Sequence, residues 1–170
     1  MGAAAATPPG AEVIDIGDAT LLPGFIDAHT HLAMMHSEDY KQNQLDQSQK
    51  TIAERALDAS VYARVTLMAG ITTVRDVGSS DYPDVGLRHA IRDRVVPGPR
   101  VLVTVHALGA RGGHCDHEDG FRAGLFGHES GSLDGVINGS EQARFAVQRV
   151  DTLSVKKTPC TLRERRGFHG

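Results

Sequence analysis

The sequence of 170 residues lacks several features that would place it in a common class of protein. Two cysteines, Cys115 and Cys160, are too few for a disulfide framework, so a reducing cytoplasm is the expected location. No apolar run approaches the roughly 18 residues that a spanning helix needs, so no membrane association is expected. The net charge of -3 argues against a nucleic-acid partner. The first ten residues are not expected to be a signal peptide, because they have no basic start and no long apolar stretch, and the sequence has no Gly-x-x-x-x-Gly-Lys-Ser/Thr phosphate motif.

What remains has the composition of a soluble globular domain, with 40% hydrophobic and 23% charged residues. Its clearest chemical signal is a pair of histidines, His29 and His31, at the end of an apolar run that follows Pro23-Gly24. Because side chains alternate along a β-strand, these two imidazoles are predicted to share one face and converge on one metal ion. The alternative is that the two histidines lie in the same strand without binding a common metal, since the spacing alone is a weak signal.

Strands and helices alternate along the chain up to about residue 150. Apolar runs predict strands at 12–18, 24–32, 71–77 and 100–106. Apolar residues at three- and four-residue steps predict helices at 48–69, 84–96 and 140–150. In the first helix they form a predicted apolar stripe of Ile52, Ala56, Leu57, Val61, Val65 and Met68. Ser48 is the predicted N-cap of the first helix and Gly70 its stop, and residues 34–47 are predicted to be a loop. The alternation from residue 24 onward indicates three βα units with parallel strands.

A long segment rich in glycine and histidine, residues 107–138, follows the third predicted strand. Loops of this length are usually functional or disordered. Within it, Gly112-Gly113-His114-Cys115-Asp116 places a histidine beside backbone that can approach a ligand closely. We expect His114 to donate a hydrogen bond to a substrate carbonyl or carboxylate and Asp116 to orient it. The alternative is a histidine that contacts only solvent.

Three of these segments carry a family resemblance. Pro-Gly-Phe-Ile-Asp-Ala-His-Thr-His-Leu, residues 23–32, resembles the first barrel strand of the metal-dependent amidohydrolase superfamily, and residues 69–76 resemble the second. The Gly-Gly-His-x-Asp loop is similar to that of the Xaa-Pro dipeptidase (prolidase-type) and imidazolonepropionase-like members. The resemblance implies an α/β fold, a partial TIM (β/α)8 barrel comprising about the first three βα units. A complete barrel takes about 250 residues, more than this chain contains.

The resemblance also implies an organisation into three parts. Residues 1–22 would be the end of a small β-sandwich, residues 23–150 the first part of the barrel, and residues 151–170 a basic tail outside the family pattern. The tail has a net charge of +3, whereas residues 1–150 have a net charge of -6. In the family pattern, a lysine at the end of the fourth barrel strand bridges the metal ions; it would fall near position 159, where this chain has Pro159. We expect the tail to reflect a changed reading frame or gene model, the alternative being an ordinary disordered basic terminus.

The function implied is metal-dependent hydrolysis of a C–N bond in a small amide, such as an Xaa-Pro dipeptide or an N-acyl amino acid. His29 and His31 would be metal ligands, the metal would be divalent, with zinc expected and two ions in the complete family member, and homo-oligomers are common. In the family, a bridging lysine and two later histidines complete the metal centre, and an aspartate serves as the base. No residue of this chain matches them, so the chain by itself is expected to be inactive. Two alternatives stay open: a deaminase of cyclic substrates from the same superfamily, and a non-catalytic module that binds a metal or a partner.

Overall fold

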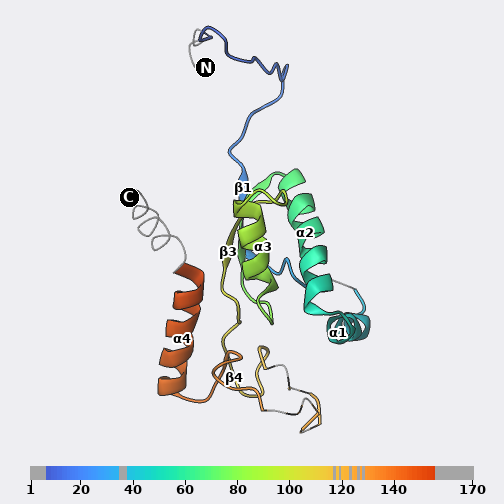
Figure 1. The fold of residues 1–170 in the computed structure, drawn as a ribbon, viewed down its shortest axis with the longest axis vertical. Helices are drawn as coiled ribbons and strands as arrows, with labels where there is room; N and C mark the ends of the chain where they lie inside the picture. The colour runs from blue at the N-terminus through green and yellow to red at the C-terminus, as the bar shows by residue number, and fades with distance from the viewer. Residues whose placement is uncertain are drawn as a thin grey trace, which may run out of the picture.

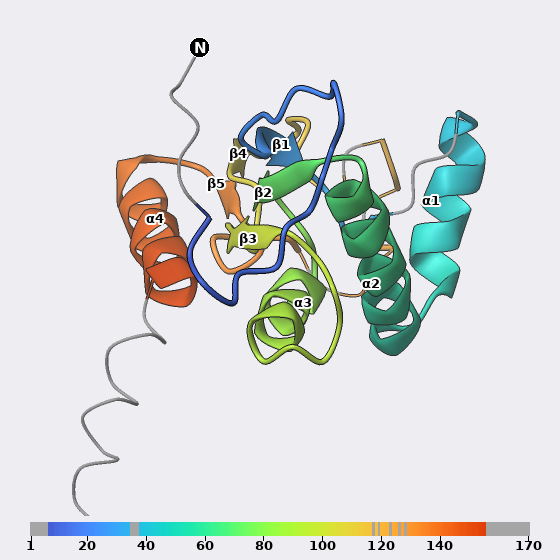
Figure 2. The ribbon, with the colours of Figure 1, turned by 90° about the horizontal axis from the view of Figure 1, so that it is seen from above.

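The structure is a computed structural model that describes residues 7–155, apart from residues 35–37, 117, 119, 123, 126 and 128. Its elements are, in chain order, β1 (Phe25–Thr30), α1 (Tyr40–Gln49), α2 (Ile52–Met68), β2 (Ile71–Asp76), α3 (Pro83–Arg92), β3 (Arg100–Val103), β4 (Gly109–Ala110), β5 (Val136–Ile137) and α4 (Ser140–Val155). Strands β1, β2 and β3 form a parallel sheet with β2 in the centre (Figure 2). The predicted α/β alternation with parallel strands is confirmed.

The hydrophobic core lies between this sheet and the helices α2 and α3, which pack against the same face of it (Figure 2). From the sheet, Val74, Val101 and Val103 point into the core. From the helices, Ala59 and Leu87 meet them. The two parallel crossovers therefore bring the carboxyl ends of β1, β2 and β3 to one end of the sheet, next to the loops that follow them.

Helix α2 begins at a capping box and ends at a glycine. The Thr51 hydroxyl accepts a hydrogen bond from the Glu54 backbone N–H at 3.3 Å, and the Glu54 carboxylate accepts one from the Thr51 N–H at 2.8 Å. Gly70 follows the helix with φ of +88°, a conformation that glycine adopts without a steric penalty. Gly70 is thus confirmed as the stop, whereas the helix start predicted at Ser48 is wrong.

The segment predicted as a loop, residues 34–47, contains most of helix α1 instead. Asp39 caps that helix by accepting hydrogen bonds from the Lys41 and Gln42 backbone N–H groups at 2.9 and 3.3 Å. Ser48 lies inside α1, where its hydroxyl donates to the Leu45 carbonyl at 2.8 Å. The helix was missed because its residues are nearly all polar, so that it has no apolar periodicity to detect.

The side of α2 that faces the sheet also differs from the prediction. The larger apolar residues of the predicted stripe are exposed: Ile52, Leu57, Val61, Val65 and Met68. The small side chains of Ala59 and Ala63 are buried instead, which lets the helix approach the sheet closely. The apolar spacing therefore predicts the helix correctly, but the buried face of α2 is the one that carries small residues.

Helix α3 and strand β3 are shorter than predicted, and the N-terminal segment also differs from the prediction. Helix α3 ends at Arg92 and strand β3 at Val103, each earlier than predicted, and residues with positive φ follow both, Arg94 at 60° and Val105 at 69°. Residues 7–24 form no helix or strand and run away from the body of the molecule, so the strand predicted at 12–18 is wrong (Figure 1).

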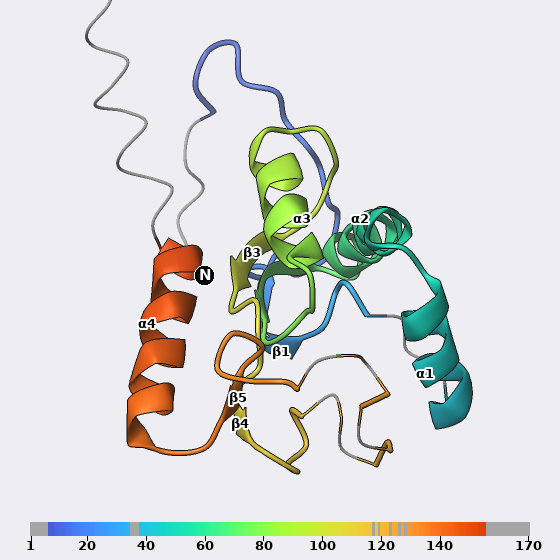
Figure 3. The same cartoon turned by 60° about the horizontal axis from the view of Figure 1, so that its bottom comes forward.

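Beyond β3 the described chain is less regular. The short parallel strands β4 and β5 join the two ends of the long loop, and α4 lies on the side of the molecule away from α1 and α2 (Figure 3). Helix α4 continues to Val155, past its predicted end, and the tail residues discussed above, from Lys156 on, lie outside the described residues. None of the described helices is long and apolar enough to cross a membrane.

Candidate metal centre

The two predicted metal ligands lie next to each other where β1 ends. His29 is the fifth residue of β1 and His31 follows its last residue, and both side chains are accessible to solvent. Their ring centroids are 5.4 Å apart, with the ring planes inclined by 73°. The two imidazoles therefore project from the same side of the extended segment, as the alternation of side chains along a strand predicts.

A backbone carbonyl fixes the orientation of one of these rings. The Nδ1 atom of His31 lies 3.0 Å from the carbonyl oxygen of Gly78, in the loop after β2. A carbonyl oxygen only accepts hydrogen bonds, so this contact requires that Nδ1 carry the proton. The neutral ring then has its lone pair on Nε2, the atom left available for a metal.

A buried carboxylate lies behind His31 at the carboxyl end of β2. Asp76 has 0% of its surface exposed, and its Oδ2 atom accepts a hydrogen bond from the Leu32 N–H at 2.8 Å. Its Oδ1 atom accepts one from the Gly78 N–H at 3.3 Å. Burial raises the pKa of Asp76 from 3.8 to about 6, against the opposing effect of the two backbone hydrogen bonds.

A second carboxylate, Asp84, is buried to the same extent at the start of α3. It accepts hydrogen bonds from the Val85 N–H at 2.9 Å and the Val105 N–H at 3.2 Å. Its charge contributes to the raised pKa of Asp76. Asp84 thus ties α3 to the turn that follows β3, and it holds Val105 in the left-handed conformation that a β-branched residue rarely adopts.

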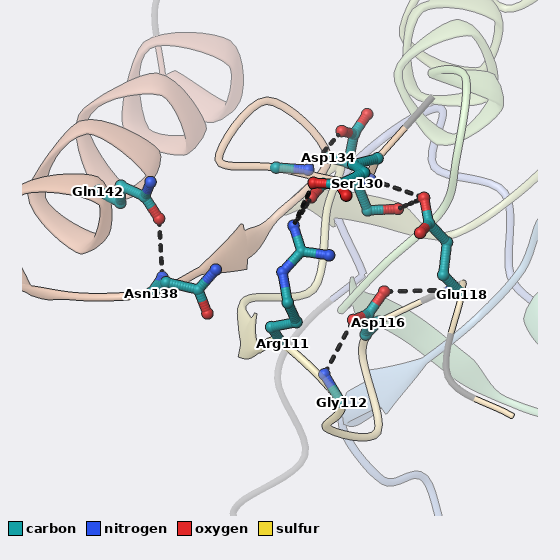
Figure 4. A network of polar contacts seen from close by, with 10 residues as sticks. Arg111, Gly112, Asp116, Glu118, Ser130, Asp134, Asn138 and Gln142 are labelled. Atoms are coloured by element: carbon teal, nitrogen blue, oxygen red, sulfur yellow. Dashed lines mark hydrogen bonds and ion pairs between the residues drawn. The ribbon is translucent and has the colours of Figure 1, made fainter. Parts of the chain in front are cut away.

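The long loop that follows β3 is held by polar side chains (Figure 4). The Glu118 carboxylate accepts hydrogen bonds from the Ser130 N–H and hydroxyl at 2.7 and 3.1 Å, and Arg111 donates to the Ser130 carbonyl at 2.6 Å. Asp116, 7% exposed, accepts hydrogen bonds from the backbone N–H groups of Gly112 and Glu118 at 2.9 and 3.1 Å. These bonds join the glycine-rich start of the loop to its return segment.

The two predicted substrate-binding residues occupy different environments in this loop. His114 is exposed, and its side chain makes no hydrogen bond with any of the described residues. Asp116 is buried and binds the loop backbone, so it acts on the conformation of the loop that carries His114. Their roles toward a substrate stay predictions. Within the described ranges, no group of three or more His, Cys, Asp or Glu side chains is placed to hold a metal ion.

Comparison with known proteins identifies the family. Residues 20–151 match the amidohydrolase family, which is most of the chain and includes both histidines. The chain belongs to the amidohydrolase family. The resemblance seen in the sequence is thereby confirmed, and with it an α/β fold of the TIM-barrel kind; members of this superfamily generally use divalent metals. No curated protein matches the chain.

Solved structures give the same result. A Xaa-Pro dipeptidase with methionine bound in its active site is 29% identical with a TM-score of 0.63, over 77% of this chain and 31% of that one. An amidohydrolase is 27% identical with a TM-score of 0.66, over 89% of this chain and 36% of that one. A prolidase complexed with N-methylphosphonate-L-proline is 25% identical with a TM-score of 0.58, over 84% and 36%. The chain spans about a third of the length of these relatives.

Sequence reasoning missed the residues that support the histidine pair. Asp76 was part of the second predicted strand, but nothing in the sequence showed that its carboxylate reaches Leu32, which lies 44 positions earlier. A charged residue at the end of a β-branched run was the available signal, because charged side chains are seldom buried without a specific role.

Proposed function

We propose that this chain supplies two histidine ligands, His29 and His31, to the divalent-metal centre of a hydrolase that acts on C–N bonds of small amides. The observation that supports this most directly is the adjacency of the two rings together with the contact between His31 Nδ1 and the Gly78 carbonyl. A ligating histidine typically donates its other ring N–H to a backbone carbonyl or carboxylate. Family membership and hydrolase relatives support the reaction class.

The donor set fits zinc. Zinc binds imidazole nitrogen at about 2.0–2.1 Å, and two rings in a tetrahedral site have their centroids roughly 5 Å apart. The observed separation of the His29 and His31 centroids is 5.4 Å. A bound divalent metal would supply Lewis acidity, lowering the pKa of water and polarising the scissile carbonyl. In this proposal β1, β2 and β3 with their helices correspond to the first three βα units of the barrel, and the full centre holds two ions.

The substrate proposed is a dipeptide of the Xaa-Pro type or an N-acyl amino acid. This choice is supported by the Gly-Gly-His-x-Asp loop and by the Xaa-Pro dipeptidase and prolidase among the structural relatives. His114 would donate a hydrogen bond to the carbonyl or carboxylate of this substrate. Asp116, through the backbone N–H of Gly112, would hold the loop in the conformation that presents His114.

Metal binding by the 170-residue chain tests the site. Titration calorimetry with zinc chloride should show one site whose affinity falls at least about tenfold in both His29→Ala and His31→Ala. His114→Ala is the matched control, since it removes an exposed imidazole from the loop and should leave the affinity unchanged. Equal affinity in wild type and both ligand variants would refute the site.

An activity assay tests whether the metal centre of this chain is incomplete. Two histidines do not complete a metal coordination shell, so the zinc-loaded chain should not hydrolyse glycyl-proline. Turnover that His29→Ala abolishes would contradict the expected inactivity while supporting the hydrolase. Release of ammonia from a cyclic amidine, without dipeptide hydrolysis, would instead indicate the deaminase branch.

A further inference from the structure

Asp76 is the centre of a closed set of contacts around His31. Its Oδ2 atom binds the backbone N–H of Leu32, the residue directly after His31. Its Oδ1 atom binds the backbone N–H of Gly78, and the carbonyl of that same Gly78 accepts the hydrogen bond from His31 Nδ1. One carboxylate therefore fixes both the main chain that carries His31 and the main chain that orients the His31 ring.

We propose that Asp76 is the positioning residue of the metal centre, setting the place and the ring orientation of His31 through Leu32 and Gly78. This inference rests on the proposed function, because positioning matters only if His31 binds a metal. Among the described residues, Asp76 makes no hydrogen bond to the His31 ring and binds only backbone N–H groups, so it acts through the backbone.

The burial of Asp76 argues that the carboxylate serves a purpose other than packing. Moving an ionised carboxylate out of water is unfavourable unless hydrogen bonds or an opposite charge compensate for the lost hydration. Among the described residues, no Lys, Arg or His forms an ion pair with Asp76, which is 0% exposed. Its carboxylate is compensated by the two N–H groups that flank His31 in space.

Asp84 provides a matched control within the same end of the sheet. It is buried to the same extent as Asp76 and also binds two backbone N–H groups, those of Val85 and Val105. Neither of these contacts reaches the His31 main chain or ring. The Val105 carbonyl accepts a hydrogen bond from the Ser79 N–H at 2.7 Å, so Asp84 is linked to Gly78 only through two further residues. Asp84→Asn keeps one acceptor oxygen and removes a buried carboxylate that does not itself bind Leu32 or Gly78, so it is the control used.

The first measurement uses the metal-free chain. In nitrogen-15 NMR at a pH where the imidazoles are neutral, wild-type His31 should show the tautomer protonated at Nδ1. Asp76→Ala should shift His31 toward a mixture of tautomers, because Gly78 is no longer held. Asp76→Asn, which keeps one acceptor oxygen, should give an intermediate result and covers the case in which the alanine variant fails to fold. Asp84→Asn should leave the His31 tautomer as in wild type.

The second measurement is zinc affinity. Loss of the groups that orient a metal ligand typically lowers affinity by about 10–100-fold. We expect a reduction in this range for Asp76→Ala, a smaller one for Asp76→Asn and a change of less than about twofold for Asp84→Asn. The positioning role is overturned if the Asp76 and Asp84 variants give the same tautomer and the same affinity. If wild type binds no zinc, the proposed function fails, and the tautomer measurement still decides whether Asp76 orients His31.

Discussion

Two regions of this molecule use carboxylates to bind backbone N–H groups, but in different surroundings. At the carboxyl end of the sheet, Asp76 and Asp84 are 0% exposed and lie beside the core formed by β2, β3 and α3. In the loop after β3, Glu118 is half-buried and holds Ser130 near the exposed Arg111. A hydrogen bond shielded from water is electrostatically stronger than one that competes with water. The sheet end should therefore stay ordered when the loop opens.

The difference matches the division of roles in the proposed site. Metal ligands need a fixed geometry, and the predicted ligands His29 and His31 belong to the ordered sheet end. His114, which is proposed to contact substrate, belongs to the loop, and binding residues are often carried by loops on a rigid scaffold. Packing holds the first region, whereas part-buried polar contacts hold the second.

The largest effect should come from the packed region. Leu87 is 3% exposed in the core, so Leu87→Ala should lower the free energy of unfolding by about 3.5 kcal/mol, measured by urea denaturation. Leu57→Ala is the matched control in α2, where the side chain is 69% exposed, and should change stability by less than about 0.5 kcal/mol. Equal effects would mean that the sheet and helices do not pack as described.

A pH titration of stability tests the buried carboxylate. The pKa of Asp76 is raised from 3.8 to about 6 in the folded chain, so the folded state binds the proton more tightly than the unfolded state does. The corresponding stabilisation is complete below pH 4 and is lost as pH rises through 6, and it amounts to about 3 kcal/mol. In Asp76→Asn, the free energy of unfolding should change much less with pH between about 4 and 6. If its pH dependence there stays as in wild type, the raised pKa does not belong to Asp76.

The smallest effect on overall stability is expected in the loop. Glu118→Gln weakens the two hydrogen bonds from Ser130, each worth about 1 kcal/mol, in a loop held by polar contacts away from the hydrophobic core. Amide exchange at Ser130 should become about fivefold faster, whereas the urea midpoint should stay unchanged. A large drop in the midpoint would show that the loop and the sheet unfold as one unit.

Much of the sheet could be predicted from local patterns. The β-branched run of β2, the glycine stop at Gly70 and the alternation of strands with helices define three parallel strands without tertiary information. The shared direction of His29 and His31 follows from the geometry of an extended chain alone.

The rest depends on contacts that local patterns do not contain. Helix α1 is polar, so its one sequence signal was the cap residue Asp39. The buried face of α2 is the one on which the small side chains of Ala59 and Ala63 let the helix approach the sheet closely. A hydrophobicity pattern favours the larger apolar residues and does not predict this face. The contacts of Asp76 join β2 to the segment after β1, and they exist only once those strands have paired.

The most direct test of the account is whether His29 and His31 bind the same ion. Nitrogen-15 NMR of the chain during titration with zinc should show both imidazoles responding together, saturating at one equivalent, with the metal on Nε2 of His31 and the proton kept on Nδ1. A response of only one ring, or saturation of the two rings at different zinc concentrations, would contradict the shared centre.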